Sequence, residues 1–129
     1  MKCEGNPKNY KELKFWQTAL ETTILVIKLV RSLPKEKVFW IIGDQLIRAA
    51  SSVGANIAEG YGRYKGKEFE RFLQISLGSA NEVEYWLIVL RRILPRLETK
   101  ISEIVETNSQ TIKMLASSLK TLRAKVNND

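Results

Sequence analysis

The part of the chain that most constrains its fold runs from Glu98 to Val126, where apolar residues recur in alternating steps of four and three. The repeating positions are Ile101, Val105, Asn108, Ile112, Leu115, Leu119, Leu122 and Val126. Such spacing places every member on one face of a helix, so the segment predicts a long helix packed against other helices. Asn108 is the polar member that interrupts this seam.

Residues 11–33 form the first predicted helix, which ends before Pro34 because proline disfavours helical geometry in the residue before it. Apolar residues at helical spacing give this helix a stripe that we expect to face the core. The stripe consists of Leu13, Trp16, Leu20, Ile24, Ile27, Val30 and Leu33.

Residues 38–59 form the second predicted helix. Its inward face consists of Phe39, Ile42, Leu46, Ala49, Val53 and Ile57. A ridge of small residues around Gly54 follows one side of this helix, so we expect another backbone to approach it there. Gly60 and Gly62 are expected to end the helix, because glycine tolerates the left-handed conformation of a helix C-cap.

Residues 66–94 form the third predicted helix, and Pro95 separates it from the fourth, residues 98–126. The inward face of the third helix consists of Phe69, Phe72, Leu73, Ser76, Ala80, Val83, Leu87 and Leu90. Four long helices with short connections and no strand pattern predict one all-α domain, residues 1–129, folded as an up-down-up-down four-helix bundle.

The run YWLIVL, from Tyr85 to Leu90, is apolar around the whole helix, and a lone bundle buries only part of that circumference. Together with VFWII at the start of the second helix, it leaves aromatic surface exposed in a monomer. We therefore expect a homo-oligomer whose interface includes Tyr85, Trp86, Phe39 and Trp40. The alternative is that Tyr85 and Trp86 line a broad face of the bundle.

The composition argues against several kinds of chemistry. The chain has no histidine, which removes the usual general base and the commonest metal ligand. Its acidic pairs stand among basic residues and are expected to be solvated surface. The single Cys3 and the interruption of the most apolar stretch, TILVIKLVRSL, by Lys28 and Arg31 are typical of a cytoplasmic protein that does not enter a membrane. We expect a protein that is not an enzyme and that needs no metal and no cofactor.

A basic surplus, with a formal net charge of +7, favours a polyanionic partner. The segment NIAEGYGRYKGKEF, residues 56–69, fits no nucleotide-binding loop, because Glu68 follows Lys67 and because Lys65 stands at the third glycine position of a dinucleotide fingerprint. It instead begins a cluster of cations and aromatic rings that suits RNA phosphates and bases. The cluster consists of Arg63, Lys65, Lys67, Arg71, Tyr61 and Tyr64. The alternative is a solvated helix entrance whose lysines maintain solubility.

A polar stripe at helical spacing predicts a network between the second and third helices. Its members are Arg48, Ser52, Asn56 and Glu59 on the second helix and Ser76, Ser79 and Glu82 on the third. We expect Arg48 to meet a carboxylate, and Asn56 or Glu59 to bond backbone amides of the turn.

Four segments of the chain are FWQTAL, QLIRAASSVGANIAEGYGR, KEFERFLQISLGSANEVEYWL and IKMLASSLKTL. In this order they resemble the bacterial four-helix-bundle family, also called the 23S rRNA intervening-sequence protein family. The match covers nearly the whole chain, and its N-I-A-E-G-x-G-R core is specific to that family. By position, the signature comprises Gln45, Arg48, Asn56, Glu59, Gly60, Gly62, Arg63, Phe72, Leu73, Gly78, Ser79 and Glu82. Gly54 departs mildly from the family pattern, which affects packing alone.

The resemblance implies a bundle that assembles as a barrel-like, homopentameric ring. Members are encoded in intervening sequences of large ribosomal RNA genes or stand alone in genomes. Distant relatives are accessory proteins of diversity-generating retroelements, where a basic pentamer binds RNA and a reverse transcriptase. The sequence thus predicts a homopentamer that binds RNA or DNA as an accessory factor, with a reverse transcriptase as a further class of partner. The alternatives are a structural or protein-interaction oligomer with no nucleic-acid role, and a carboxylate enzyme that requires a divalent metal.

Overall fold

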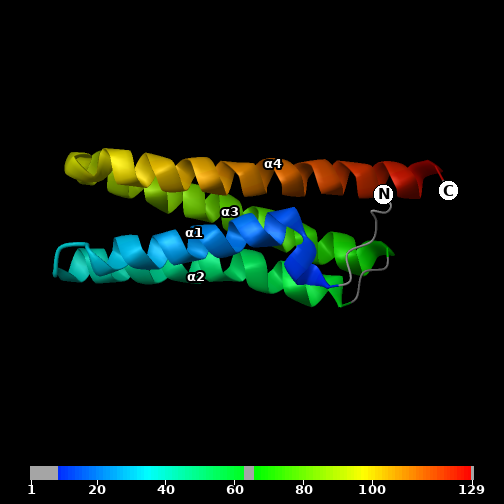
Figure 1. Cartoon of the computed structure of the whole chain (residues 1–129), viewed down its shortest axis with the longest axis horizontal. Coiled ribbons are helices and arrows are strands. Elements are labelled where there is room, and N and C mark those ends of the chain that lie inside the picture. Colours follow the sequence, from blue (N-terminus) through cyan, green and yellow to red (C-terminus); the bar gives the residue numbers. More distant parts are fainter. Residues whose placement is uncertain (1–8, 63–65, 129) are drawn as a thin grey trace.

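The computed structural model describes residues 9–62 and 66–128, and its regular elements within these ranges are all helical. The elements are η1 (Tyr10–Glu12), α1 (Lys14–Arg31), α2 (Lys37–Tyr61), α3 (Gly66–Ile93), η2 (Pro95–Leu97) and α4 (Glu98–Asn128). Successive long helices run in opposite directions in Figure 1, so the predicted all-α, up-down-up-down four-helix bundle is confirmed. Cys3 lies outside the described residues.

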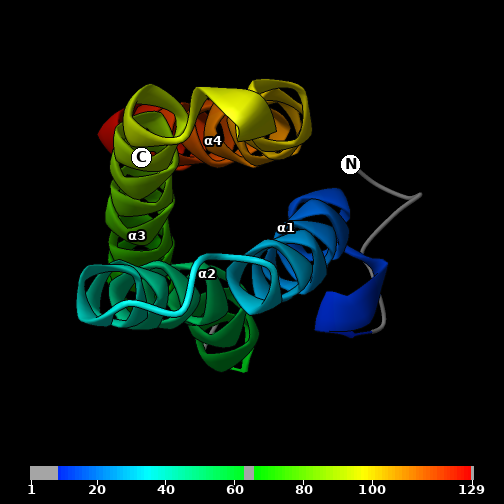
Figure 2. The ribbon, with the colours of Figure 1, turned by 90° about the vertical axis from the view of Figure 1, so that its left-hand side faces the viewer.

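The four helices occupy the corners of a square, which Figure 2 shows end-on. Each helix packs against its neighbours in sequence, α1 also packs against α4, and the pairs α1/α3 and α2/α4 are diagonal. The α1–α2 and α3–α4 connections therefore lie at the same end of the bundle, on the left in Figure 1. We call residues 28–37 and 91–100 the loop end, and residues 59–71, where α2 meets α3, the turn end.

The core lies between the inward faces that the sequence predicts for α2 and α3. All six predicted inward residues of α2 are buried, and on α3 the six from Leu73 to Leu90 are buried. The largest fully buried side chains include Leu29, Leu46, Ile57, Leu73, Leu87, Leu90, Ile101, Leu115 and Leu119. Burial of such side chains, each stabilising by about 1.5–3 kcal/mol, is the main force holding the four helices together.

The predicted inward stripe of α1 is wrong at its centre, where the helix turns a different side to the core. Leu20, Ile24 and Ile27 are 44%, 39% and 39% exposed. The rest of the stripe does face inwards, because Leu33 is buried and Leu13, Trp16 and Val30 are half-buried against the core. The buried residues of α1 itself are Phe15, Ala19, Thr22, Val26 and Leu29. Thr23 Oγ1 donates a hydrogen bond to the Ala50 carbonyl oxygen of α2 at 3.0 Å, so the threonine side of α1 takes part in the packing.

Two predicted glycine roles on α2 also differ from the structure. The helix continues through Gly60, and Gly62 has a right-handed backbone with φ −65°, so neither residue provides a left-handed cap. Gly60 is required by space: a Cβ there would lie 2.5 Å from the Phe72 Cβ of α3. At Gly54 a Cβ would lie 3.6 Å from Trp16 Nε1 of α1, which is an ordinary contact. The closest approach of another helix to α2 is therefore that of α3 at Gly60, and not one at Gly54.

The buried face of α4 follows a slightly different repeat from the predicted seam. Ile104 and Thr111 are buried, whereas Val105 and Ile112 are only half-buried. A straight helix turns once every 3.6 residues, so a stripe with a strict period of 3.5 drifts around it. Asn108 is buried and its Nδ2 donates to a carbonyl oxygen of α3 at 2.9 Å, but it is not the single polar residue on this face.

Candidate nucleic-acid interface

The described residues contain no cluster of metal-ligating side chains. Within 9–62 and 66–128 there is no group of three or more Cys, His, Asp or Glu side chains that could hold a metal ion. In the same ranges no helix is long and apolar enough to cross a membrane. Charged and aromatic surfaces lie at the two ends of the bundle.

The predicted cluster of cations and aromatic rings lies at the turn end, and the structure describes part of it. Tyr61 is the last residue of α2, and Lys67 and Arg71 lie on the first two turns of α3. The members outside the described residues are Arg63, Tyr64 and Lys65. An RNA contact by this cluster stays a prediction.

Carboxylates accompany the described cations of the turn end. Arg71 Nη2 lies 3.5 Å from Glu68 Oε1, and its guanidinium carbon lies 4.7 Å from the centre of the Phe72 ring. Arg123, which α4 brings to the same end, lies with its Nε 2.8 Å from Glu70 Oε2. Exposed pairs of this kind contribute little to stability, but the carboxylates lower the positive potential that a phosphate would meet.

A hydrogen-bond network links α2 and α3 near this end, as the polar stripe predicts. The Ser52 and Ser79 hydroxyls are 2.9 Å apart, and Asn56 Nδ2 donates to the Ser52 carbonyl oxygen at 2.8 Å and to its hydroxyl at 2.9 Å. Ser76 Oγ donates to the Val53 carbonyl oxygen at 2.9 Å. These bonds satisfy polar groups where two helices pack closely, and therefore fix the alignment of α2 against α3.

Of the two residues expected to bond the turn amides, Asn56 instead bonds back to its own helix, because its side chain lies beside Ser52 one turn earlier. The same role for Glu59 stays a prediction, whereas the expected carboxylate partner of Arg48 is wrong. Arg48 is exposed and forms no ion pair with another described residue. It shares a shallow hollow of about 280 Å³ with Gln45 and Glu82, but Glu82 Oε2 accepts a hydrogen bond from a neighbouring tryptophan of α3 at 3.3 Å. Glu59 is exposed near the end of α2.

The loop end is strongly basic. Its lysines and arginines are Lys28, Arg31, Lys35, Lys37, Arg91, Arg92, Arg96 and Lys100. Two acids, Glu36 and Glu98, stand against these eight, so this end carries +6 of the chain's net +7. None of the eight cations forms an ion pair with a described residue, and Arg91 Nη1 donates to Ser102 Oγ at 3.1 Å.

Helix dipoles account for part of this charge. Lys28 and Arg31 lie in the last turn of α1, and Arg91 and Arg92 lie in the last turn of α3, where cations stabilise the negative end of a helix. The same reasoning does not apply to Lys37 and Lys100, because they lie in the first turns of α2 and α4, where a cation is unfavourable. Nor does it account for the loop cations. The excess charge of the loop end is therefore not explained by helix stability alone.

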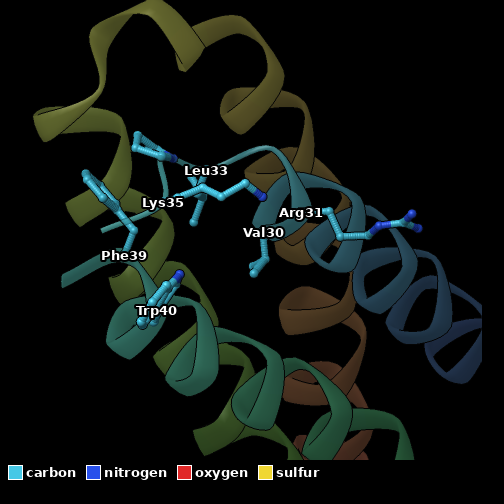
Figure 3. Close-up of a pocket in the computed structure, with 7 residues that line it drawn as sticks. Val30, Arg31, Leu33, Lys35, Phe39 and Trp40 are labelled. Atoms are coloured by element: carbon cyan, nitrogen blue, oxygen red, sulfur yellow. The ribbon is translucent and has the colours of Figure 1, made fainter. Parts of the chain in front are cut away.

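An aromatic hollow lies within the loop end, between the end of α1 and the start of α2 (Figure 3). It measures about 420 Å³ and is lined by Val30, Arg31, Leu33, Pro34, Lys35, Phe39 and Trp40. In Figure 3 the Lys35 side chain extends towards the end of α1, Trp40 lies below it in the view, and the Arg31 guanidinium points away from Trp40. Trp40 is 66% exposed, the highest fraction among the large apolar side chains of the described residues.

The predicted oligomer surface is divided between different parts of the molecule. Phe39 is only 9% exposed and belongs to the core, so its assignment to an interface is wrong. Tyr85 is 59% exposed and its ring lies edge-on to the half-buried Trp86, with 5.0 Å between the ring centres. A second surface, lined by uncharged residues, follows α1 and α2, where a groove of about 310 Å³ opens beside Leu20. Its lining residues are Tyr10, Trp16, Leu20, Thr23, Ser51, Gly54, Ala55 and Ala58.

Sequence reasoning missed the loop end because its cations are far apart in the chain. Residues 28–37 and 91–100 are separated by more than fifty positions, and each group alone is an ordinary helix end. A signal was nevertheless present: cations flank both Pro34 and Pro95, the breaks after the first and third helices. In an up-down-up-down bundle those two breaks must lie at one end, which brings the two groups together.

Comparisons with known proteins agree with the fold. A solved structure from Bacteroides thetaiotaomicron VPI-5482, described as a protein with unknown function from the S23 ribosomal protein family, is 29% identical, with a TM-score of 0.76. The similarity covers 82% of this chain and 98% of that one. None of the curated proteins compared matches the chain. Residues 11–117 match the family described as 23S rRNA-intervening sequence protein, and the chain belongs to that family.

Proposed function

We propose that this protein is a non-enzymatic accessory protein that binds RNA and acts as a homo-oligomer. The observation that carries the proposal is the loop end, where eight cations face two acids and none is paired with a described carboxylate. Unpaired surface cations bind polyanions strongly, because each neutralised phosphate releases condensed counterions.

RNA is favoured over duplex DNA by the shape and chemistry of this end. The cations surround two short connections and an exposed tryptophan. Loops and single strands of RNA offer unstacked bases to aromatic side chains and phosphates to nearby cations. The family description, which mentions intervening sequences of 23S rRNA, is consistent with an RNA partner.

Self-association is supported by the apolar surface of α1. Leu20, Ile24 and Ile27 lie on the outside of a lone bundle, next to the groove between α1 and α2. A second copy would remove this surface from water, and a closed ring of copies would repeat the basic end around one face, which raises the avidity for a long RNA. We propose the homopentamer that the family resemblance implies. Light scattering that reports the monomer mass of 14.8 kDa would overturn this part.

The experiment that tests RNA binding compares two variants that each lose four positive charges. The first carries Ala at the loop-end positions Arg31, Lys35, Arg92 and Arg96. The matched control carries Ala at the exposed positions Lys14, Lys113, Lys120 and Lys125. We expect the loop-end variant to lose about 100-fold in affinity for a single-stranded RNA near physiological salt, and its log-log salt slope to fall by about 3. The control is expected to stay within about threefold of the wild type.

A structural or protein-interaction oligomer is the second candidate, because the uncharged groove between α1 and α2 fits a protein partner as well as a second copy. The same titration separates the two functions. A protein that binds no RNA at about 50 mM salt, where phosphate contacts are strong, and still forms its oligomer would support the second candidate and overturn the first.

A further inference from the structure

We propose that the hollow around Trp40 binds one unpaired nucleotide of a single-stranded RNA. The base stacks on the Trp40 indole, and the phosphates on either side of it contact Arg31 and Lys35. This inference rests on the proposed RNA-binding function and adds a defined site to it.

The exposure of Trp40 is the first observation. Phe39 and Trp40 are neighbours at the start of α2, yet Phe39 is 9% exposed and Trp40 is 66% exposed. A tryptophan buries about 150–250 Å² when it is packed, so leaving the indole in water forgoes a large stabilisation. A ring that the fold holds at the surface is available to a flat, apolar partner, and every nucleobase has such a face.

The shape of the hollow is the second observation. Leu33 and Phe39, two buried residues of the core, belong to its lining, so part of its wall is as rigid as the bundle itself. The volume of about 420 Å³ falls within the range of about 300–1,000 Å³ that small-molecule sites occupy. A single nucleotide therefore fits, whereas a duplex, whose bases are stacked inside, cannot place a base there.

The charge of the lining is the third observation. Arg31 and Lys35 are both exposed, and neither is paired with a described carboxylate. None of the seven lining residues is acidic. In Figure 3 the Lys35 side chain extends across the hollow towards the end of α1, whereas the Arg31 guanidinium points away from Trp40. A strand whose base lies on the indole would therefore meet Lys35 beside the hollow and Arg31 further along its path. Sites that bind single-stranded nucleic acids combine cations with an aromatic ring on which a base stacks.

An interface between copies is the competing role for Trp40. In a ring the contacts between copies are head-to-tail, so a self-interface at Trp40 would need a different, acidic surface of the next copy opposite Arg31 and Lys35. The uncharged groove beside Leu20 lies further along α1 and does not include Trp40. A surface of apolar character for self-association is therefore present elsewhere, and the oligomer mass of the Trp40 variants distinguishes the two roles.

The test compares Trp40→Ala and Trp40→Phe with the wild type on two probes, a fluorescein-labelled oligouridine of about twelve nucleotides and inorganic polyphosphate. Loss of one stacked base is expected to weaken oligouridine binding about 10-fold in Trp40→Ala. Trp40→Phe keeps a stacking ring and is expected to stay within about threefold. Polyphosphate has charge but no bases, so both variants should bind it like the wild type. The tryptophan fluorescence that oligouridine quenches in the wild type should not be quenched in Trp40→Phe.

Three outcomes would overturn the inference. Trp40→Ala could bind oligouridine as tightly as the wild type, could lose polyphosphate binding to the same extent, or could have a changed oligomer mass in light scattering. If the wild type binds oligouridine and Trp40→Ala binds it equally tightly, the Trp40 site is rejected but the proposed RNA-binding function is not. A wild type that binds neither probe at low salt rejects the proposed function as well. Because Trp40 is exposed, both variants should keep the helix content of the wild type, which circular dichroism checks.

Discussion

The two ends of this bundle differ in how their polar side chains are used. At the turn end Gly60 lets α3 approach closely, and Arg71 and Arg123 each have a carboxylate within 3.5 Å. At the loop end eight cations have no ion-pair partner among the described residues, and Trp40 is mostly in water. Lys67 at the turn end also has no ion pair with a described residue, but the loop end brings eight such cations together.

The two ends therefore have different roles: polar groups at the turn end stabilise helix packing, and cations at the loop end are available to bind a partner. Polar groups that are satisfied within the fold hold helices in place and contribute to stability. Charges left unpaired contribute little to stability and are available to an external anion. We therefore expect substitutions at the turn end to alter the free energy of unfolding, and substitutions at the loop end to alter RNA affinity. The following predictions test that division.

The largest expected effect is that of Gly60→Ala at the turn end. The new Cβ would lie 2.5 Å from the Phe72 Cβ, an atom that cannot move without its backbone. We expect α2 and α3 to separate locally and the free energy of unfolding to fall by about 2–3 kcal/mol. Urea denaturation at one fixed protein concentration measures this, since the stability of an oligomer depends on concentration.

Gly78→Ala is the matched control on the same pair of helices. Gly78 is exposed within α3, and a Cβ there would meet nothing within 4 Å. Alanine is the better helix former, so this variant is expected to gain up to about 1 kcal/mol. If Gly60→Ala were as stable as Gly78→Ala, the close approach of α2 and α3 at the turn end would be wrong.

The fold was predictable from the sequence because the information that sets it is local. Periodic apolar residues place Leu46 and Leu87 on inward faces, and Pro34 and Pro95 mark two connections. The face of α1 was not predictable, because TTILVIKLV offers apolar residues on every side. The choice depends on hydrogen bonds from threonines to other helices, such as that of Thr23 to α2, and these exist only once the helices are packed.

The loop end was not predictable for a related reason. Whether a cation is free depends on which carboxylates the fold brings near it. Lys67 and Arg71 are close to Tyr61 in sequence and so appeared as one patch. Lys35 and Arg96 belong to two connections that are far apart in the sequence. The chain crosses the length of the bundle between those connections, and the surface that they share appears only in three dimensions.

An intermediate effect is expected for Asn56→Ala, which removes the amide that bonds Ser52 on α2. A half-buried hydrogen bond contributes about 1 kcal/mol, so the free energy of unfolding should fall by about that amount in urea denaturation. RNA affinity, measured by fluorescence anisotropy, should not change. The loop-end variant with four alanines should show the reverse, with normal stability and weak RNA binding. A loss of RNA affinity in Asn56→Ala with stability intact would contradict the division between the two ends.

The smallest effect is expected for Arg71→Ala. Arg71 is an exposed cation 3.5 Å from Glu68, in a pair that contributes about 0–0.5 kcal/mol. Removing it takes away one positive charge and frees one negative charge, so RNA affinity should fall by less than about threefold. The single variant Glu68→Gln, with Arg71 retained, removes the compensation instead, and is expected to raise affinity slightly at low salt. If Arg71→Ala weakened RNA binding as much as the loss of four loop-end cations, the turn end would be the principal RNA contact. The ion pair with Glu68 would then have to break when RNA binds, and the salt slope of the wild type would exceed that of Arg71→Ala by about one.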